Sequence, residues 1–414
     1  MPLSDLVMSD VRVPRGGRVQ LGRVEGNLFV EPKAEIGPDA TGRIVIAGNA
    51  SFEGDALIAG EFESQRLRLD DGTVRVKGNL TVSEDTRASD AELEVFGNFN
   101  GRTVDVDRSL HVHGEGVATD VEVGGSFQAD GGFRAQTISA GGRVRVAGTL
   151  VADEIEVGGT LSLGTVDLKR LKVGGSAEVK GGKISEVIEV GGKFSSTEEL
   201  TFGSLEVGGI ATLGGASQGG TIEVGGKFSA DKDLRFENLE IGGMGNIAGN
   251  GTGRSVEIGG RFTVGGALAL TGTLEVGGEI SVAGPVRADQ LEIGGRFTAQ
   301  RAVFSGNAEV GGRLVTTDGL RAGRIRLGRK AEARGPLIGE EVELDRSARA
   351  ESIYGRRVRL RRGCEVGRVI GDSIDIEDDC SVEEVQYVTD LKLGRNVRTR
   401  VAPQRIASLP SFPL

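Results

Sequence analysis

The 414-residue chain has few of the residues that organise most globular cores and catalytic sites. It contains no Trp, 2 Tyr, 2 His, 2 Cys and 9 Pro. The shortage of bulky aromatic residues excludes a core of the usual aromatic kind, and two cysteines exclude a disulfide framework. Two histidines leave little material for catalysis that needs a His general base. Low Pro, without Gly at every third position, excludes a collagen-like triple helix.

Long apolar runs are also missing. No stretch of about 18 apolar residues occurs, so we expect no membrane-spanning helix. The first residues lack a basic segment followed by an apolar one, the pattern of a secretory signal. We therefore expect a protein of the reducing cytoplasm. The formal net charge of −10 argues against general nucleic-acid binding.

Glycine is the residue in excess, with 69 in the chain. Much of this excess is phased: a Gly-Gly doublet follows an apolar-polar-apolar triplet again and again, with a period of 17 in most copies. The doublets begin at residues 124, 141, 158, 174, 191, 208, 225, 242, 259, 277, 294 and 311. The triplet continues without the doublet as far as residue 393.

Apolar residues hold fixed positions relative to each doublet, in pairs two positions apart. Such pairs indicate β-strands with one buried face, and three pairs per repeat indicate three short strands per turn. The sequence predicts an all-β fold, a single-stranded parallel β-helix or triangular solenoid of about 17 residues per coil. This period favours a right-handed coil over a left-handed one, whose period is a strict 18. The predicted core ladder includes Phe127, Phe194, Phe228, Phe262, Phe297, Val157, Val190 and Val224.

The doublet is predicted to form one corner of each coil, where positive φ or close backbone approach excludes a side chain. The regularity of the repeat divides the chain into three parts. Residues 1–110 form an irregular β-rich part, either further coils or a cap, and residues 111–400 form the regular β-helix rod. Residues 401–414 form a flexible tail that contains three prolines.

Two pairs of residues are candidates for special chemistry. His111 and His113 face outward on one strand and can chelate a metal weakly, but the sequence names no third ligand. Cys364 and Cys380 hold the same position on successive coils, so we expect reduced, buried neighbours. No nucleotide-binding or phosphate-binding glycine motif is present. We expect no catalytic residue and no cofactor.

A basic segment stands out in this acidic chain. Residues 321–368 hold 14 Lys or Arg against 7 Asp or Glu, including Arg356, Arg357, Arg359, Arg361 and Arg362. Such a patch fits an anionic membrane surface, an acidic protein partner or another copy of the chain. The absence of interleaved aromatic residues argues against nucleic acid.

The repeat resembles that of bactofilins, polymer-forming cytoskeletal proteins. Residues 143–159 (RVRVAGTLVADEIEVGG) carry the resemblance, and residues 282–295 (VAGPVRADQLEIGG) repeat it. The resemblance implies a right-handed β-helix that assembles end to end, without nucleotide, into non-polar filaments, sometimes at membranes. This chain differs from the family in being several times longer than its usual single core.

These observations predict a structural scaffold, not an enzyme, that self-associates through its terminal coils. An end coil carries an unpaired edge, which must be capped or paired with another copy. One alternative is a β-helix enzyme, either a hexapeptide acyltransferase or a polysaccharide-processing protein. The other is a discrete scaffold that does not polymerise.

Overall fold

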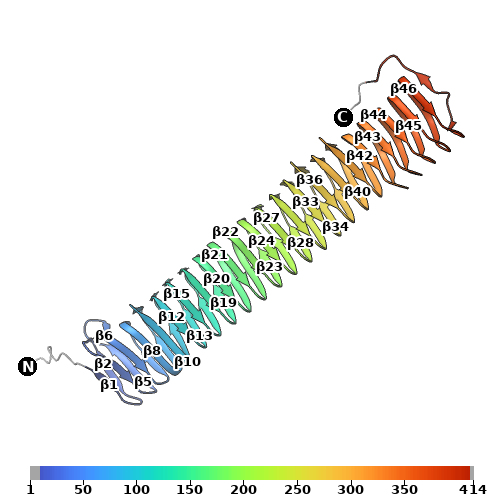
Figure 1. Ribbon diagram of the computed structural model, residues 1–414. Helices are drawn as coiled ribbons and strands as arrows, with labels where there is room; N and C mark the ends of the chain where they lie inside the picture. The colour runs from blue at the N-terminus through green and yellow to red at the C-terminus, as the bar shows by residue number, and fades with distance from the viewer. Residues whose placement is uncertain (1–9, 411–414) are drawn as a thin grey trace, which may run out of the picture. The chain divides into compact units, whose positions relative to one another are not determined.

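The computed structural model describes residues 10–410 (Figure 1). Within these residues the chain forms 48 β-strands and no helix. It follows that the described residues contain no helix long and apolar enough to cross a membrane. The strands fall into two compact units, one ending at Val207 and the other beginning at Gly208. Each unit is a parallel β-solenoid.

The first unit contains β1 to β24. Their bounds are Val11–Val13, Arg18–Leu21, Arg23–Val24, Leu28–Val30, Ala34–Pro38, Arg43–Phe52, Ala56–Ile58, Glu61–Val76, Leu80–Val82, Asp85–Val95, Phe99–Asn100, Thr103–Val106, Ser109–Val112, Gly116–Val117, Asp120–Val123, Ser126–Ala129, Phe133–Arg134, Thr137–Ala140, Arg143–Val146, Leu150–Val157, Thr160–Val173, Ser176–Val190, Lys193–Ser196 and Leu200–Val207.

The second unit contains β25 to β48. Their bounds are Ile210–Leu213, Ser217–Gln218, Thr221–Val224, Lys227–Ala230, Leu234–Arg235, Asn238–Ile241, Met244–Ile247, Gly251–Gly253, Ser255–Ile258, Arg261–Val264, Leu268–Leu270, Thr273–Val276, Glu279–Val282, Val286–Ala288, Gln290–Ile293, Arg296–Phe304, Asn307–Val310, Arg313–Leu327, Glu332–Leu344, Arg349–Leu360, Glu365–Ile376, Ser381–Leu393, Arg398–Thr399 and Gln404–Arg405.

Each strand pairs in parallel with the strand one turn later. In the first unit β15 pairs with β18, β16 with β19 and β17 with β20, so three strands complete a turn. In the second unit β27, β28 and β29 pair in the same way with β30, β31 and β32. The registers join equivalent positions of successive repeats, as in Val123 with Ala140. The predicted fold class, an all-β parallel β-helix, is confirmed, and so is the period of its turns.

The interior of each unit is a set of apolar columns. The eight residues of the predicted core ladder are all buried, with exposed fractions of 0–3%. In the second unit Phe228, Phe262 and Phe297 share one column but do not follow one another directly. Phe228 and Phe262, for example, flank Gly245 on the turn between them. A large ring on one turn therefore fills space that a smaller residue leaves on the next.

The phased glycine doublets let the backbones of successive turns approach too closely for a side chain to fit between them. A Cβ on Gly141 would lie 2.4 Å from the carbonyl oxygen of Gly124, and one on Gly142 would lie 2.4 Å from that of Gly125. Positive φ is not used there: the positive-φ glycines of the described residues are Gly16, Gly42, Gly54, Gly72, Gly182, Gly319, Gly335 and Gly363, none of them in a phased doublet. Of the two roles that the sequence leaves open for the doublet, the structure selects the second.

The later turns of the second unit make the corresponding corner differently. Where the doublet is missing, the third residue after each apolar triplet has positive φ. These residues are Lys330, Ser347, Gly363, Asp379 and Asn396, with φ between 58° and 76°. A left-handed residue replaces the close glycine contact, so side chains are admitted at a corner that excludes them elsewhere.

The two cysteines lie in this part of the second unit. Cys364 and Cys380 are both buried and free. The pairing of Glu365 with Ser381 places the two at equivalent positions on successive turns. The neighbouring thiol and burial together raise the pKa of Cys364 above its ordinary value, which keeps it protonated.

Residues 10–110 span strands β1 to β12 and the start of β13, and the spacing between paired residues varies there. Val11 pairs with Leu28 one regular period later, whereas the next pairing in the same column, Leu28 with Ala50, spans a longer stretch of chain. Extra residues are therefore inserted between strands of the ladder. In the predicted tail, β48 pairs in parallel with β46, and residues 411–414 lie outside the described residues.

Candidate functional site

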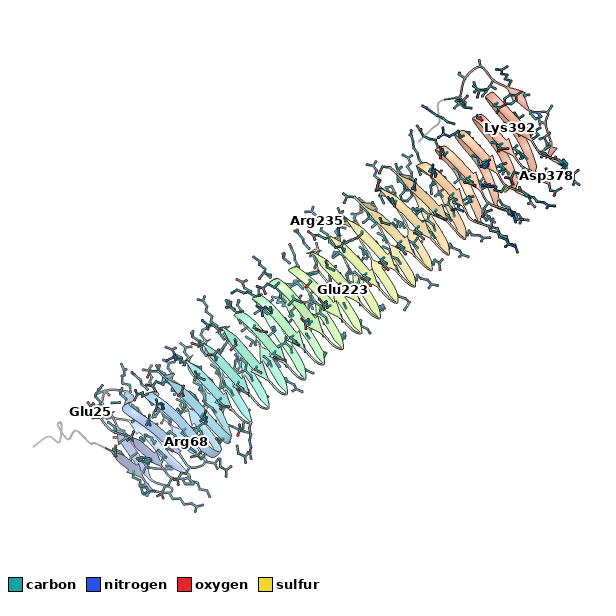
Figure 2. The ribbon with its side chains drawn as sticks, in the orientation of Figure 1. Glu25, Arg68, Glu223, Arg235, Asp378 and Lys392 are labelled. Atoms are coloured by element: carbon teal, nitrogen blue, oxygen red, sulfur yellow. The ribbon has the colours of Figure 1, made fainter. Side chains whose placement is uncertain are left out.

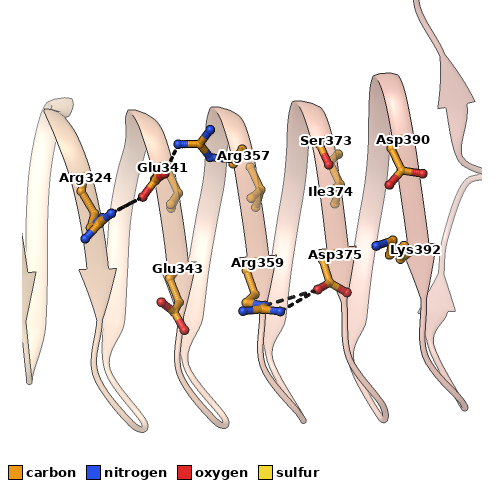
Figure 3. Close-up of a pocket in the computed structure, with 12 residues that line it drawn as sticks. Arg324, Glu341, Glu343, Arg357, Arg359, Ser373, Ile374, Asp375, Asp390 and Lys392 are labelled. Carbon is orange, nitrogen blue, oxygen red and sulfur yellow. Dashed lines mark hydrogen bonds and ion pairs between the residues drawn. The ribbon is translucent and has the colours of Figure 1, made fainter.

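Charged side chains cover the outer faces of the strands, as Glu223 and Arg235 do in the second unit (Figure 2). One dense arrangement lies on strands β42 to β46, within and just beyond the segment that the sequence marks as basic. Because the strands are in parallel register, each outward position forms a column along successive turns. Two such columns line a shallow groove of about 300 Å³, with Val342, Val358 and Ile374 between them (Figure 3).

The first column alternates in charge over three turns. It consists of Arg324, Glu341, Arg357, Ser373 and Asp390. Arg324 donates to Glu341 at 2.6 Å, and Arg357 donates to the other oxygen of the same carboxylate. The donations from Arg357 and Arg324 hold the pKa of Glu341 below its ordinary value. One carboxylate therefore joins three successive turns.

The second column lies two residues further along each strand. It consists of Arg326, Glu343, Arg359, Asp375 and Lys392. The Arg359 Nη2 atom lies 3.2 Å from Asp375 Oδ2, and Arg326 pairs with Glu309 on the preceding turn at 3.5 Å. The second column is thus also bridged by ion pairs between turns.

Four of the five arginines in the predicted basic patch form ion pairs with carboxylates. Arg357 pairs with Glu341 and Arg359 with Asp375. Arg361 lies 2.9 Å from Glu343 and 3.3 Å from Glu377, and Arg362 lies 2.9 Å from Asp379. Arg356 is exposed. In the predicted basic patch, positive and negative side chains therefore alternate, and the surface is not uniformly positive.

The sequence contained a signal for these carboxylate partners. Glu341 lies one repeat after Arg324 and one repeat before Arg357, and Asp375 lies one repeat after Arg359. The total charge of the segment does not show this alternation. The charges at equivalent positions of successive repeats do.

Both columns of charged residues end on β46, and part of the outer backbone edge of this strand has no paired strand. Along its length β46 pairs with β45, and on its other side β47 and β48 pair only with Ser381, Val382, Gln386 and Tyr387. Among residues 10–410, no strand pairs with the outer edge of residues 389–393. Within the described residues, the backbone groups of this edge therefore have no strand partner, and such an edge can pair with another strand.

The end of the apolar core is uncovered at the same place. Leu393 is 48% exposed, whereas its equivalent on the preceding turn, Ile376, is 1% exposed. Leu391 is half-buried, while its equivalent Ile374 is fully buried. The core residues of this turn lack the cover that the preceding turn receives from the next one.

The last charges of the two columns flank this apolar edge. Asp390 and Lys392 lie on either side of Leu391 in the strand. Neither forms an ion pair with any other residue of the described chain, although the columns below them are bridged. The edge thus presents a negative, an apolar and a positive side chain in sequence.

These features define the class of the protein as a parallel β-solenoid with inter-turn charge ladders and an open terminal edge. Comparison with models of protein families, with curated proteins and with solved structures found no match for this chain.

Proposed function

We propose that this chain is a structural protein that self-associates through its last turn to form end-to-end assemblies without nucleotide. The uncovered edge of β46, residues 389–393, carries the proposal. An edge of this kind combines unpaired backbone groups with exposed core residues, and a second copy satisfies both at once. The resemblance of the repeat to bactofilins points to the same kind of protein.

The charges at the edge favour one geometry, in which two last turns meet about a two-fold axis. Antiparallel pairing centred on Leu391 puts Asp390 of each copy opposite Lys392 of the other, so both unpaired charges gain a partner. The same patch serves both copies, as an isologous contact requires.

Head-to-tail stacking is less favourable in the same register. Val11 and Leu391 hold the same position in the repeat, so β1 of a second copy would follow β46. That register sets Asp10 against Asp390 and Arg12 against Lys392. Like charges directly opposite one another destabilise a strand pair. We therefore propose that two last turns meet each other, so that the assembly has no head-to-tail direction.

We place this assembly in the cytoplasm, where the two free, buried cysteines fit a reducing environment. The partner that we propose is a second copy of the chain. An anionic membrane surface or an acidic protein is a weaker candidate for residues 321–368, because most arginines of the patch are already bound to carboxylates.

The test is to measure the assembly state of the full chain and of edge variants by sedimentation and electron microscopy. We expect Leu393→Glu to abolish the end-to-end contact, because it places a charge in the apolar part of the edge. Lys392→Asp should weaken it, and the double exchange Asp390→Lys with Lys392→Asp should restore it. Met244→Glu is the matched control, since Met244 is 52% exposed within an inner turn.

Two results would contradict the proposal. One is a wild-type chain that stays monomeric at every salt and protein concentration, which indicates a discrete scaffold. The other is an assembly that Leu393→Glu leaves intact, which places the contact elsewhere.

A further inference from the structure

The only two histidines of the chain, His111 and His113, meet two carboxylates on the outer surface of the first unit. His111 lies on β13, and His113 follows directly after this strand. Glu94 on β10 is the register partner of His111. Asp130 follows β16, and its backbone N–H donates to Val112, which brings it beside the two imidazoles. Three successive turns thus contribute to one cluster.

The potential ligand atoms are close together. Asp130 Oδ2 lies 3.0 Å from His111 Nε2 and 2.8 Å from His113 Nδ1, and Glu94 Oε1 lies 3.3 Å from His113 Nε2. One such atom from each of Glu94, His111 and His113 lies within 4.8 Å of the other two. A tetrahedral ion with bonds of about 2.0–2.1 Å separates its ligand atoms by about 3.3 Å. Small side-chain movements therefore convert this cluster into a coordination sphere.

Neighbouring side chains already orient the two carboxylates. Arg75 Nε donates to Glu94 Oε2 at 2.9 Å, and Gln128 Nε2 donates to Asp130 Oδ1 at 2.9 Å. In each case the other oxygen is the one that faces the imidazoles. Outer contacts of this kind fix ligands in metal sites and raise their affinity.

The ring of His113 is also fixed in orientation. Phe96 stacks on it with a centroid distance of 4.7 Å and an interplanar angle of 22°. Lys77 Nζ lies 3.4 Å from the centroid of the Phe96 ring. This stack holds the imidazole in place and covers one of its faces, which reduces the rotamer entropy lost on binding a metal.

We propose that His111, His113 and Glu94 bind a divalent transition metal ion, with Asp130 on Nδ1 of His113 as the carboxylate that orients this imidazole. Two imidazoles with carboxylate oxygens suit Zn²⁺, Co²⁺, Ni²⁺ or Cu²⁺ better than Mg²⁺ or Ca²⁺, which prefer oxygen ligands alone. Because its ligands come from two successive turns, the ion cross-links these turns. The site is independent of the last turn and of self-association.

The experiment is a titration of the full chain, prepared without a polyhistidine tag and stripped with a chelator, first with Zn²⁺ by calorimetry. We expect one ion per chain and a rise in thermal stability that grows with Zn²⁺ concentration. Co²⁺ is the spectroscopic probe, and its visible absorption should report tetrahedral nitrogen and oxygen ligands. Changing Arg75→Ala, which removes the contact that orients Glu94, should weaken binding by about 10–100-fold.

Two further variants separate a true site from weak surface binding. Glu94→Gln keeps the shape of the side chain and should remove most of the affinity, and the pair His111→Ala with His113→Ala should abolish binding. Glu122→Gln, an exposed carboxylate of the same unit, is the control and should bind like the wild type. The proposal is overturned if no Zn²⁺ binds, or if the double histidine variant, folded by circular dichroism, binds it as well as wild type. The cluster is then a metal-free ion-pair network.

Discussion

At the residue scale, the space for each core side chain is set by its neighbours on the adjacent turns. Gly116 lies between Phe99 and Phe133 in the register of the ladder. A Cβ at Gly116 would lie 2.1 Å from atoms of the Phe133 ring. The ring occupies the volume that the glycine leaves free. Small and large residues on successive turns therefore form a packing unit.

We predict that Gly116→Ala destabilises the first unit by about 1–3 kcal/mol, the usual result of overpacking a core. Gly37→Ala is the matched control, because a Cβ there meets nothing closer than 3.9 Å. Its effect should stay within about 0.5 kcal/mol. Chemical denaturation of the two variants measures the difference, and equal effects would contradict this account of the packing.

The charge ladder makes stability depend on pH through Glu341. Its pKa is lowered in the folded protein by Arg357 and Arg324. Stabilisation from a carboxylate with a lowered pKa is present above the unfolded value, about 4.3, and is lost as the pH falls through the folded value. We expect the melting temperature of Glu341→Gln to fall less than that of the wild type on acidification below about pH 4.5. If the melting temperatures of the two proteins fall in parallel with pH, Glu341 does not cause the pH dependence of stability.

The histidine cluster shows what the sequence contains at this scale and what it hides. The sequence indicated that His111 and His113 face outward, but it named no third ligand. Glu94 lies one repeat before His111, and Asp130 lies one repeat after His113, so the repeat period itself marks both. The irregular spacing before residue 110 masked the first of these relations. The orientation of the carboxylates by Arg75 and Gln128 requires side-chain geometry, which no spacing supplies.

At the element scale, the two kinds of corner differ in what they exclude. The corner at Gly142 has no room for a side chain, whereas Gly363 has room but has a φ of 76°. The sequence predicted a corner at each doublet from spacing alone. It left the physical reason open because lack of space and positive φ both select glycine. The positive-φ corners carry mixed residues such as Lys330 and Ser347, so composition did not reveal them.

This difference predicts opposite rankings for the same two substitutions. At Gly363, Asn should cost less than Ala, because Asn tolerates the left-handed region better. At Gly142, Asn should cost at least as much as Ala, because the obstacle is the carbonyl oxygen of Gly125 at 2.4 Å. Denaturation midpoints of the four variants test the ranking. An identical order at both positions would mean that the corners share one constraint.

At the scale of the whole molecule, the chain is a series of local contacts. The strand pairings link each turn to the one before it and the one after it, as β28 links to β25 and β31. Stability in such a fold is close to a sum of terms for single turns and for adjacent pairs. The repeat period predicted this architecture because the same contacts recur in every turn. It did not predict the division at Val207, because the repeat continues through that point.

A destabilising substitution in one turn should therefore lower the local stability of the adjacent turns and leave distant turns of the same unit unchanged. Phe228 is fully buried, and Phe228→Ala should cost about 3–5 kcal/mol by removing core contacts and leaving a cavity. We expect faster amide hydrogen exchange in β25 to β31, with no change in β43 to β45, which lie several turns further along the chain. Met244→Ala, at an exposed position of the same region, should change neither set. A uniform rise in exchange across the unit after Phe228→Ala would instead show that the unit unfolds as one cooperative body, and stability could not then be assigned turn by turn.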